Sequence, residues 1–138
     1  MMTTAIRAHR ILAALANYQS AEIAGSEIFE PHVPHLGAPV GCYRNPGVAG
    51  ELVAVFADGL SWTEAEGAIG VRFAEIVDVS LPEGKESEAL SLWLSGDREL
   101  RLPIRGGLGR CHDSLEVLRF LDRVCEDGRR RAAAEAAR

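Results

Sequence analysis

Apolar residues recur at helical spacing in the first segment of the chain, TTAIRAHRILAALANYQSAEIAG. On a helix they form one stripe, made of Ala8, Ile11, Leu12, Leu15 and Tyr18. Thr3 or Thr4 can cap the start of this helix, and Gly25 can end it. We therefore expect an N-terminal helix over residues 4–24. The segment EPHVPHLGAP then brings three prolines, so residues 30–39 are predicted to be a connector.

After residue 39 the pattern changes from helical spacing to the alternation that is typical of strands. VGCYRN predicts a short strand that ends at the turn sequence Asn45-Pro46-Gly47. In ELVAVFADGLSWTE two apolar runs flank Asp58-Gly59, a dipeptide that favours a hairpin. In GAIGVRFAEIVDVSL the alternation changes phase at Ala74-Glu75, which predicts a bulge or a tight corner.

A polar loop, residues 82–88, precedes a second alternating segment, ALSLWLSGDRELRLPIRG, which predicts a hairpin around Gly96-Asp97. One face of this hairpin is apolar and comprises Leu90, Leu92, Leu94, Leu100, Leu102 and Ile104. The other face carries Ser91, Trp93, Ser95, Arg101 and Pro103. Such regular alternation predicts an antiparallel sheet with one buried face.

The last segment, SLEVLRFLDRVCED, returns to helical spacing, and its apolar arc covers more than half of the helix circumference. We expect an amphipathic helix over residues 114–127, ended by Gly128, with residues 129–138 as a frayed helical tail. The predicted fold class is α+β: an antiparallel barrel or sheet of six to seven strands, a C-terminal capping helix and an added N-terminal helix. We expect a single domain over residues 1–138.

The composition is that of an ordinary soluble globular domain, with 47% hydrophobic and 25% charged residues in a chain of 138. The longest unbroken apolar runs, such as residues 11–16, are too short for a membrane span, and no secretory signal is recognisable. Three cysteines do not close a disulfide framework, which favours reduced thiols in the cytoplasm. The net charge of −5 disfavours general binding to nucleic acids or anionic membranes.

Cys111, His112 and Asp113 stand side by side, and a thiol, an imidazole and a carboxylate are the groups of a nucleophilic site. Working triads, however, are assembled from separate segments of a chain. The sequence Asp113-Ser114-Leu115-Glu116 has instead the form of a capping box, which satisfies free N–H groups at a helix start. We therefore interpret the stretch as the start of a helix and predict no catalytic residue.

His32 and His35, together with Cys42 and the Cys111-His112 pair, offer groups that can ligate a metal. Their spacing matches neither a helical zinc motif nor a C-x-x-C pair, and exposed loop histidines are the simpler interpretation. We predict neither a metal nor another cofactor.

The glycine-rich stretch RGGLGR, residues 105–110, joins a predicted strand to a predicted helix. Its N–H groups, at a helix N-terminus and beside two arginines, can hold a phosphate or a carboxylate. The stretch matches neither the P-loop nor the dinucleotide fingerprint, and a flexible turn also explains it. The candidate anion-binding site comprises Arg105, Gly106, Gly107 and Arg110.

A second candidate, a partner surface, is expected on the solvent side of the strands, where the alternation places Arg72, Trp93 and Arg101. A basic patch with an aromatic residue can bind a protein partner or a nucleic acid. A charged strand face is more often only solvated. Trp62, just after the Asp-Gly turn, is expected in the core or at its rim.

The order of these motifs resembles the pleckstrin-homology-like (PH-like) and GRAM-like domains of bacteria. The resemblance lies in the Asp-Gly-Leu hairpin that leads to Trp62, the segment VRFAEIVDV (residues 71–79), two alternating strands and the C-terminal helix. In those domains a phrase of the type apolar-Pro/Arg-aromatic-x-Asp/Glu-Ile-x-x-Val precedes the last pair of strands. The resemblance covers about residues 40–127 and leaves the N-terminal helix as an addition.

The PH-like resemblance implies a bent antiparallel barrel of about seven strands, capped at one end by the C-terminal helix. It also implies a binding scaffold rather than an enzyme. PH domains that bind inositol phosphates carry lysine and arginine in the loop between their first two strands. The Asp58-Gly59 turn has no such residues, so lipid binding does not carry over.

We therefore expect a non-catalytic, cytoplasmic interaction domain, of adaptor or immunity type, that binds an unidentified protein. A homodimer stays open, a membrane partner is not expected, and a nucleic acid is the least favoured partner. The alternative is a small-anion-binding or ligand-binding domain, or an enzyme, centred on residues 105–113.

Overall fold

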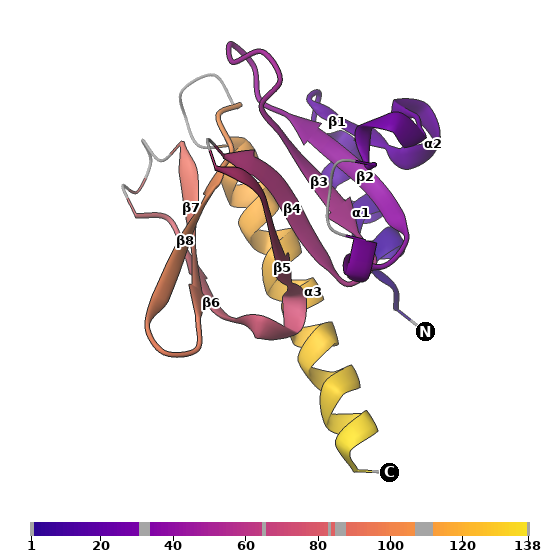
Figure 1. Cartoon of the computed structure of the whole chain (residues 1–138), viewed down its shortest axis with the longest axis vertical. Helices are drawn as coiled ribbons and strands as arrows, with labels where there is room; N and C mark the ends of the chain where they lie inside the picture. The colour runs from indigo at the N-terminus through magenta and orange to yellow at the C-terminus, as the bar shows by residue number, and fades with distance from the viewer. Residues whose placement is uncertain are drawn as a thin grey trace.

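In the described part of the chain, eight strands form two antiparallel sheets, accompanied by three α-helices (Figure 1). One sheet has five strands and the other has three, and neighbouring strands follow each other in sequence. The structure is a computed structural model that describes residues 2–30, 34–64, 66–82, 84, 88–106 and 112–137.

The N-terminal segment is helical only in its first part. α1 (Thr4–Ile11) is capped by Thr3, whose Oγ1 accepts a hydrogen bond from the N–H of Ile6 at 3.2 Å. One 3₁₀ turn, η1 (Leu12–Ala14), follows, and the backbone is extended at Leu15.

A short strand, β1 (Tyr18–Ser20), and a single helical turn, α2 (Ala21–Ala24), follow instead of more helix. The predicted helix over residues 4–24 is therefore wrong beyond residue 14. Asn17, Tyr18 and Ser20 are weaker helix formers, and pairing with the large sheet replaces the helical hydrogen bonds of this segment. The carbonyl of Asn17, for example, accepts the N–H of Arg44 at 2.9 Å.

The predicted connector over residues 30–39 is irregular where the structure describes it. One short 3₁₀ turn, η3 (Pro34–Leu36), lies within the connector, and another, η2 (Ser26–Ile28), comes before it. The buried side chain of Leu36 packs in a small satellite core with Phe29 and Phe56.

The rest of the large sheet is a meander of four strands, β2 (Pro39–Arg44), β3 (Leu52–Phe56), β4 (Gly59–Glu64) and β5 (Gly67–Arg72). The predicted hairpin around Asp58-Gly59 is confirmed, because β3 and β4 pair in antiparallel fashion. A Cβ atom at Gly59 would lie 2.2 Å from the carbonyl oxygen of Val71 on β5, so this close approach requires glycine.

The chain crosses from one sheet to the other at a 3₁₀ turn, η4 (Phe73–Glu75). The N–H of Arg72 donates to the Glu75 carboxylate at 3.0 Å, and the side chain of Phe73 turns into the core. The sequence predicted either a bulge or a tight corner at Ala74-Glu75, and the structure has the tight corner.

The small sheet consists of β6 (Ile76–Ser80), β7 (Ala89–Leu94) and β8 (Arg98–Pro103). β7 and β8 form the predicted hairpin around Gly96-Asp97, where both residues have positive φ. The predicted apolar face is buried, with Leu90, Leu92 and Leu102 fully inaccessible.

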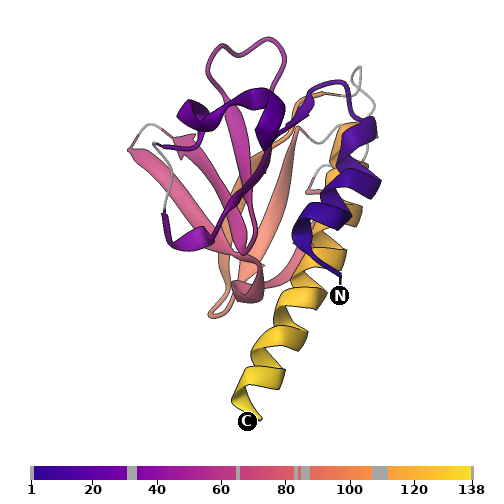
Figure 2. The ribbon, with the colours of Figure 1, turned by 90° about the vertical axis from the view of Figure 1, so that its right-hand side faces the viewer.

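The C-terminal helix, α3 (His112–Ala136), is longer than the predicted 114–127. Gly128 does not end it, so that prediction is wrong. Gly128 is buried, and a Cβ atom there would lie 3.4 Å from the backbone nitrogen of Ala74 in η4. The glycine lets α3 pass close to the corner between the sheets. The last turns of α3 extend beyond both sheets (Figures 1 and 2).

The main core lies between the two sheets, and α3 closes it on one side. α1 lies alongside α3 (Figure 2), and Arg7 of α1 forms an ion pair with Asp127 of α3 at 3.1 Å. Trp62 is 1% exposed, so its predicted core position is confirmed. The core cluster is completed by apolar side chains that include Val53, Val55, Leu60, Val71, Ile76, Ile104, Val117, Phe120, Leu121 and Val124.

The two sheets do not join into a closed barrel within the described residues. The turn η4 rotates the chain out of the large sheet, so β5 and β6 do not pair. Of the two predicted forms, barrel or sheet, the architecture is therefore the open one. The predicted count of six to seven strands is corrected to five plus three, partly because β1 lies where a helix was expected.

Candidate functional site

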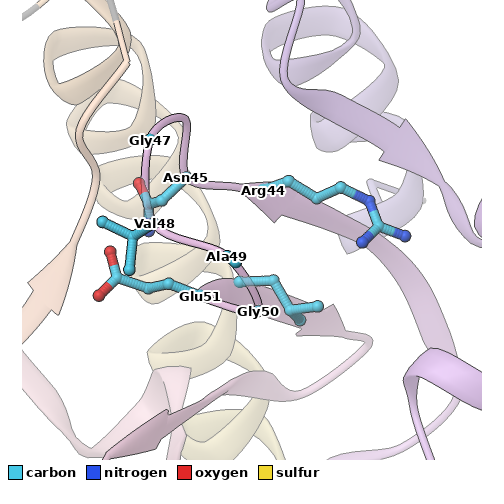
Figure 3. A pocket seen from close by; sticks show the side chains of 8 residues that line it. Arg44, Asn45, Gly47, Val48, Ala49, Gly50 and Glu51 are labelled. Atoms are coloured by element: carbon cyan, nitrogen blue, oxygen red, sulfur yellow. The ribbon is translucent and has the colours of Figure 1, made fainter.

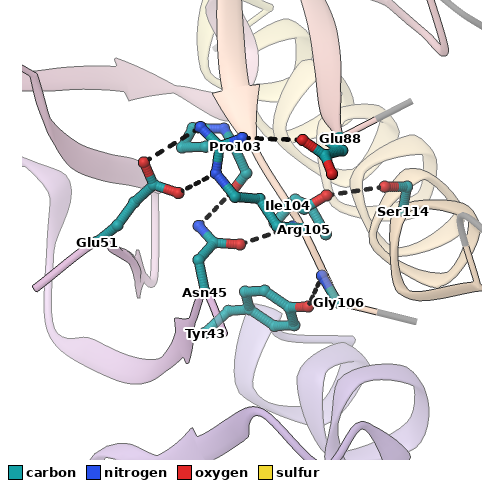
Figure 4. A network of polar contacts seen from close by, with 9 residues as sticks. All are labelled: Tyr43, Asn45, Glu51, Glu88, Pro103, Ile104, Arg105, Gly106 and Ser114. Carbon is teal, nitrogen blue, oxygen red and sulfur yellow. Dashed lines mark hydrogen bonds and ion pairs between the residues drawn. The ribbon is translucent and has the colours of Figure 1, made fainter. Parts of the chain in front are cut away.

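The described part of the candidate anion-binding stretch is tied into a polar network at the end of β8 (Figure 4). The guanidinium of Arg105 lies between two carboxylates: Nε donates to Glu51 at 2.5 Å and Nη1 donates to Glu88 at 3.1 Å. The hydrogen bond with Glu51 is the main reason that the pKa of Arg105 is raised. The charge of Arg105 is therefore compensated by the chain itself. Gly107 and Arg110 lie outside the described residues.

Asn45 bridges the two sheets in the same network. Its Nδ2 donates to the carbonyl of Pro103 at 2.9 Å, and its Oδ1 accepts the backbone N–H of Arg105 at 2.7 Å. Asn45 is 5% exposed, although the sequence suggested only a turn at this position. The bridge holds the end of β8 against the end of β2.

The N–H of Gly106 is also occupied. It donates to the hydroxyl of Tyr43 at 3.0 Å, and this hydroxyl donates to Oδ2 of Asp113 at 2.6 Å. A Cβ atom at Gly106 would lie 2.2 Å from the Tyr43 hydroxyl, so the contact requires glycine. Burial, followed by the bond to Asp113, raises the pKa of Tyr43 and keeps its hydroxyl protonated.

Asp113 lies in the first turn of α3 and not at its N-cap, because the helix already begins at His112. Its buried carboxylate accepts from Tyr43 and lies 3.2 Å from Nδ1 of His112. Glu116 instead pairs with Arg119 at 3.5 Å. The predicted helix start is confirmed, whereas the predicted capping box is wrong: a tertiary partner takes the carboxylate. Cys111 lies outside the described residues.

The two predicted sites meet at a pocket of about 440 Å³ between the end of β4 and β8. Arg101, from the candidate partner surface, and Arg105, from the candidate anion site, both line it. Trp62 also lines it, and its Nε1 donates to Glu64 at 3.2 Å. The sequence pattern did not reveal Glu51 or Glu64 as members of this site, because they come from loop and strand ends. The lining is Glu51, Trp62, Thr63, Glu64, Ala89, Arg101, Pro103 and Arg105.

Trp93 occupies the face of the small sheet that points away from the core. It is half-buried and lies outside the core cluster, whereas its neighbours Leu92 and Leu94 face inward. Arg101 is exposed on the same face, where it pairs with Glu99 at 2.9 Å. The alternation predicted this outward placement correctly.

Arg72 does not share this face. It lies at the η4 end of β5, beside a small pocket of about 230 Å³ that Asp58, Arg131 and Glu135 also line. The pocket that holds Arg101 includes Glu64 at the opposite end of the β4–β5 hairpin, a strand length of about 17 Å away. The candidate partner surface is therefore divided into two places.

The loop that joins β2 to β3 encloses another shallow pocket of about 450 Å³. Figure 3 shows Arg44 pointing away from Val48 and Glu51, so the charged groups of the loop do not converge. Glu51 is already bound to Arg105. This pocket gathers no set of groups suited to catalysis.

Of the potential metal ligands, Cys42 is fully buried, and burial raises the pKa of its thiol. His35 lies in η3, and His32 and Cys111 lie outside the described residues. Within the residues that the structure describes, no three His, Cys, Asp or Glu side chains form a group that could hold a metal. In that same part of the chain, no helix is long and apolar enough to cross a membrane.

Comparisons of the chain with protein-family models, with curated proteins and with solved structures found no match. The function is therefore inferred from the geometry of the molecule itself.

Proposed function

We propose that the protein is a non-catalytic interaction domain that binds another protein through the outer face of its small sheet. The observation that carries this proposal is the position of Trp93, a large aromatic side chain held half-exposed on a rigid sheet. Tryptophan and arginine are the residues most enriched at the energetic centres of protein interfaces. Trp93 and Arg101 lie together on this face.

The order of the elements supports a PH-like architecture for this domain. β2 to β5 form a meander of four strands, η4 turns the chain, β6 to β8 form a meander of three, and α3 follows. This is the order that the PH-like resemblance implies, with α1 and β1 as additions. PH-like domains serve as binding scaffolds, so the resemblance favours an interaction module over an enzyme.

In this proposal the domain acts in the cytoplasm as an adaptor or an immunity-type protein. Cys42 and Cys125 are free and buried, as suits a reducing compartment. The net charge of −5 favours a partner with the opposite charge.

Affinity capture of partners from the native cell, read by mass spectrometry, tests the proposal. A partner retained by the wild type is expected to be at least about tenfold depleted from the Trp93→Ala, Arg101→Ala double variant, because hot-spot truncation costs this much. Retention of the same partner by the double variant would contradict the proposal, as would capture of nothing but the protein itself.

A matched control is available on α3. Leu115 is 50% exposed, and Arg119 pairs with a neighbouring glutamate just as Arg101 does. The Leu115→Ala, Arg119→Ala double variant is therefore expected to retain the partner. Thermal unfolding of both double variants shows that they are folded at the temperature of the capture experiment.

A further inference from the structure

Trp93 stands between two carboxylates on the open face of the small sheet. The register pairs it with Asp78 of β6 on one side and with Glu99 of β8 on the other. Residues paired directly across antiparallel strands point to the same face, with Cβ atoms about 5 Å apart. The indole ring therefore has an acidic side chain on each flank.

A bulge in β6 places Asp78 on this face. The register between β6 and β7 shifts between Ile76 and Asp78, so Val77 is the bulged residue. Val79 pairs with Leu92 and packs against the core, so Asp78 points to the open side. Asp78 is exposed, and within the described residues it has no hydrogen bond or ion pair.

Glu99 is held in place with one oxygen available. Its Oε2 accepts a hydrogen bond from the hydroxyl of Ser91 at 2.5 Å and forms an ion pair with Nε of Arg101 at 2.9 Å. Both contacts fall on the same atom, and in the described part of the chain Oε1 has no partner. Ser91 and Arg101 thus fix the orientation of a carboxylate that can accept a further donor.

We propose that Trp93, Asp78 and Glu99 bind an arginine side chain of a protein partner. This inference rests on the proposed function and names the chemistry of the partner. A guanidinium group fits because its planar face stacks on an indole ring while its N–H groups donate to carboxylates. The Arg101–Glu99 pair is an example of the same recognition within the chain.

The two residues that pair directly with Trp93 are both acidic. Burial, and then the charge of Asp78, raises the pKa of Asp122 on α3, so these two carboxyl groups are near each other. Arg123 and Arg129 offset the charge of Asp122. At the indole itself, a ligand meets the carboxylates of Asp78 and Glu99 on either side and one guanidinium, that of Arg101, which is paired with Glu99.

The test is a titration followed by NMR, with the two tryptophan indole N–H signals as reporters. The probe is the peptide acetyl-Gly-Arg-Gly-Arg-amide. We expect a saturable shift of the Trp93 indole signal and no shift of the Trp62 signal, because Trp62 is buried and its Nε1 is bonded to Glu64. A matched citrulline peptide, which lacks the charge, is expected to leave both signals in place.

Variants of the two carboxylates make the test specific. Asp78→Asn and Glu99→Gln are each expected to weaken peptide binding by about threefold, the range measured for exposed ion pairs. Glu116→Gln, on α3, is the control and is expected to have no effect, because Glu116 does not belong to the small sheet and pairs with Arg119. An unsaturable shift, an equal response to citrulline, or unchanged binding by both carboxylate variants would overturn the inference. A lysine peptide that binds as tightly as the arginine peptide would overturn the choice of arginine.

The capture experiment and the titration separate the two proposals. A captured partner that depends on Trp93, together with no response to the arginine peptide, would refute the arginine site and leave the proposed function standing. If no captured partner depends on Trp93 and the arginine peptide gives no response, both proposals are refuted.

Discussion

The hydroxyl of Tyr43 joins three parts of the chain through its hydrogen bonds with Asp113 and Gly106. It comes from β2, donates to the carboxylate of Asp113 on α3 and accepts the N–H of Gly106 after β8. Asp113 is 6% exposed, and a buried carboxylate that loses a donor is costly. This single oxygen therefore stabilises the meeting point of both sheets and the helix.

The Tyr43→Phe variant tests this role. It keeps the ring but leaves the Asp113 carboxylate and the Gly106 N–H each short of one partner. We expect the free energy of unfolding to fall by about 1–3 kcal/mol, measured by urea denaturation at neutral pH. Tyr18→Phe is the matched control, because within the described residues the Tyr18 hydroxyl makes no hydrogen bond. An equal loss in both variants would contradict the role given to Tyr43.

The fate of Asp113 shows why such contacts escape a prediction from sequence. Its place before Ser114 and Glu116 matches a local capping pattern, and local patterns were all that the sequence offered. The structure gives its carboxylate to Tyr43, which lies 70 positions away in the chain. Likewise, the outward position of Trp93 follows from alternation alone. Its flanking acids do not, because the bulge at Val77 and the register between strands are not encoded in periodicity.

At the scale of elements, turn chemistry and alternation together predicted both hairpins and the corner at η4. The N-terminal segment failed because its helix-forming residues continue past the true end of α1 at Ile11. The extended backbone at Leu15 and the pairing of Tyr18 with Tyr43 depend on the distant strand β2. Tertiary pairing therefore overrides local helix propensity in this segment.

The sequence predicted that the C-terminal helix ends at Gly128, whereas α3 continues to Ala136. Substitutions at Gly128 test this difference. Gly128→Ala is expected to stabilise the protein by about 0.5–1 kcal/mol, because glycine is a poor helix former and the added Cβ would make an ordinary contact at 3.4 Å with Ala74. Gly128→Leu is expected to destabilise it by about 1–3 kcal/mol, because the larger side chain presses on η4. Urea denaturation measures both. If Gly128 ended the helix, Gly128→Ala would instead be neutral or harmful.

At the scale of the whole molecule, the two sheets are separate in their hydrogen bonding but are joined at one end by side chains. Asn45 connects β2 to the end of β8, and Arg105 connects β8 to Glu51 and Glu88. In this arrangement Arg105 is a structural cation, which bears on the alternative that residues 105–113 bind a small anion. If Arg105 is a structural cation, Arg105→Ala should lower the stability of the protein. If Arg105 binds an anion, the same variant should lose anion binding instead.

Arg105→Ala is expected to lower the free energy of unfolding by about 1 kcal/mol, because it removes contacts to two carboxylates that solvent screens in part. The wild type is expected to show no binding of inorganic phosphate by calorimetry. Arg105→Lys should recover only part of the stability, since an ammonium group lacks the fork that reaches both partners. Arg119→Ala, which breaks an exposed pair on α3, is the control and should cost about 0.5 kcal/mol or less. Phosphate binding that Arg105→Ala abolishes with unchanged stability would instead favour the anion-binding domain over the interaction domain.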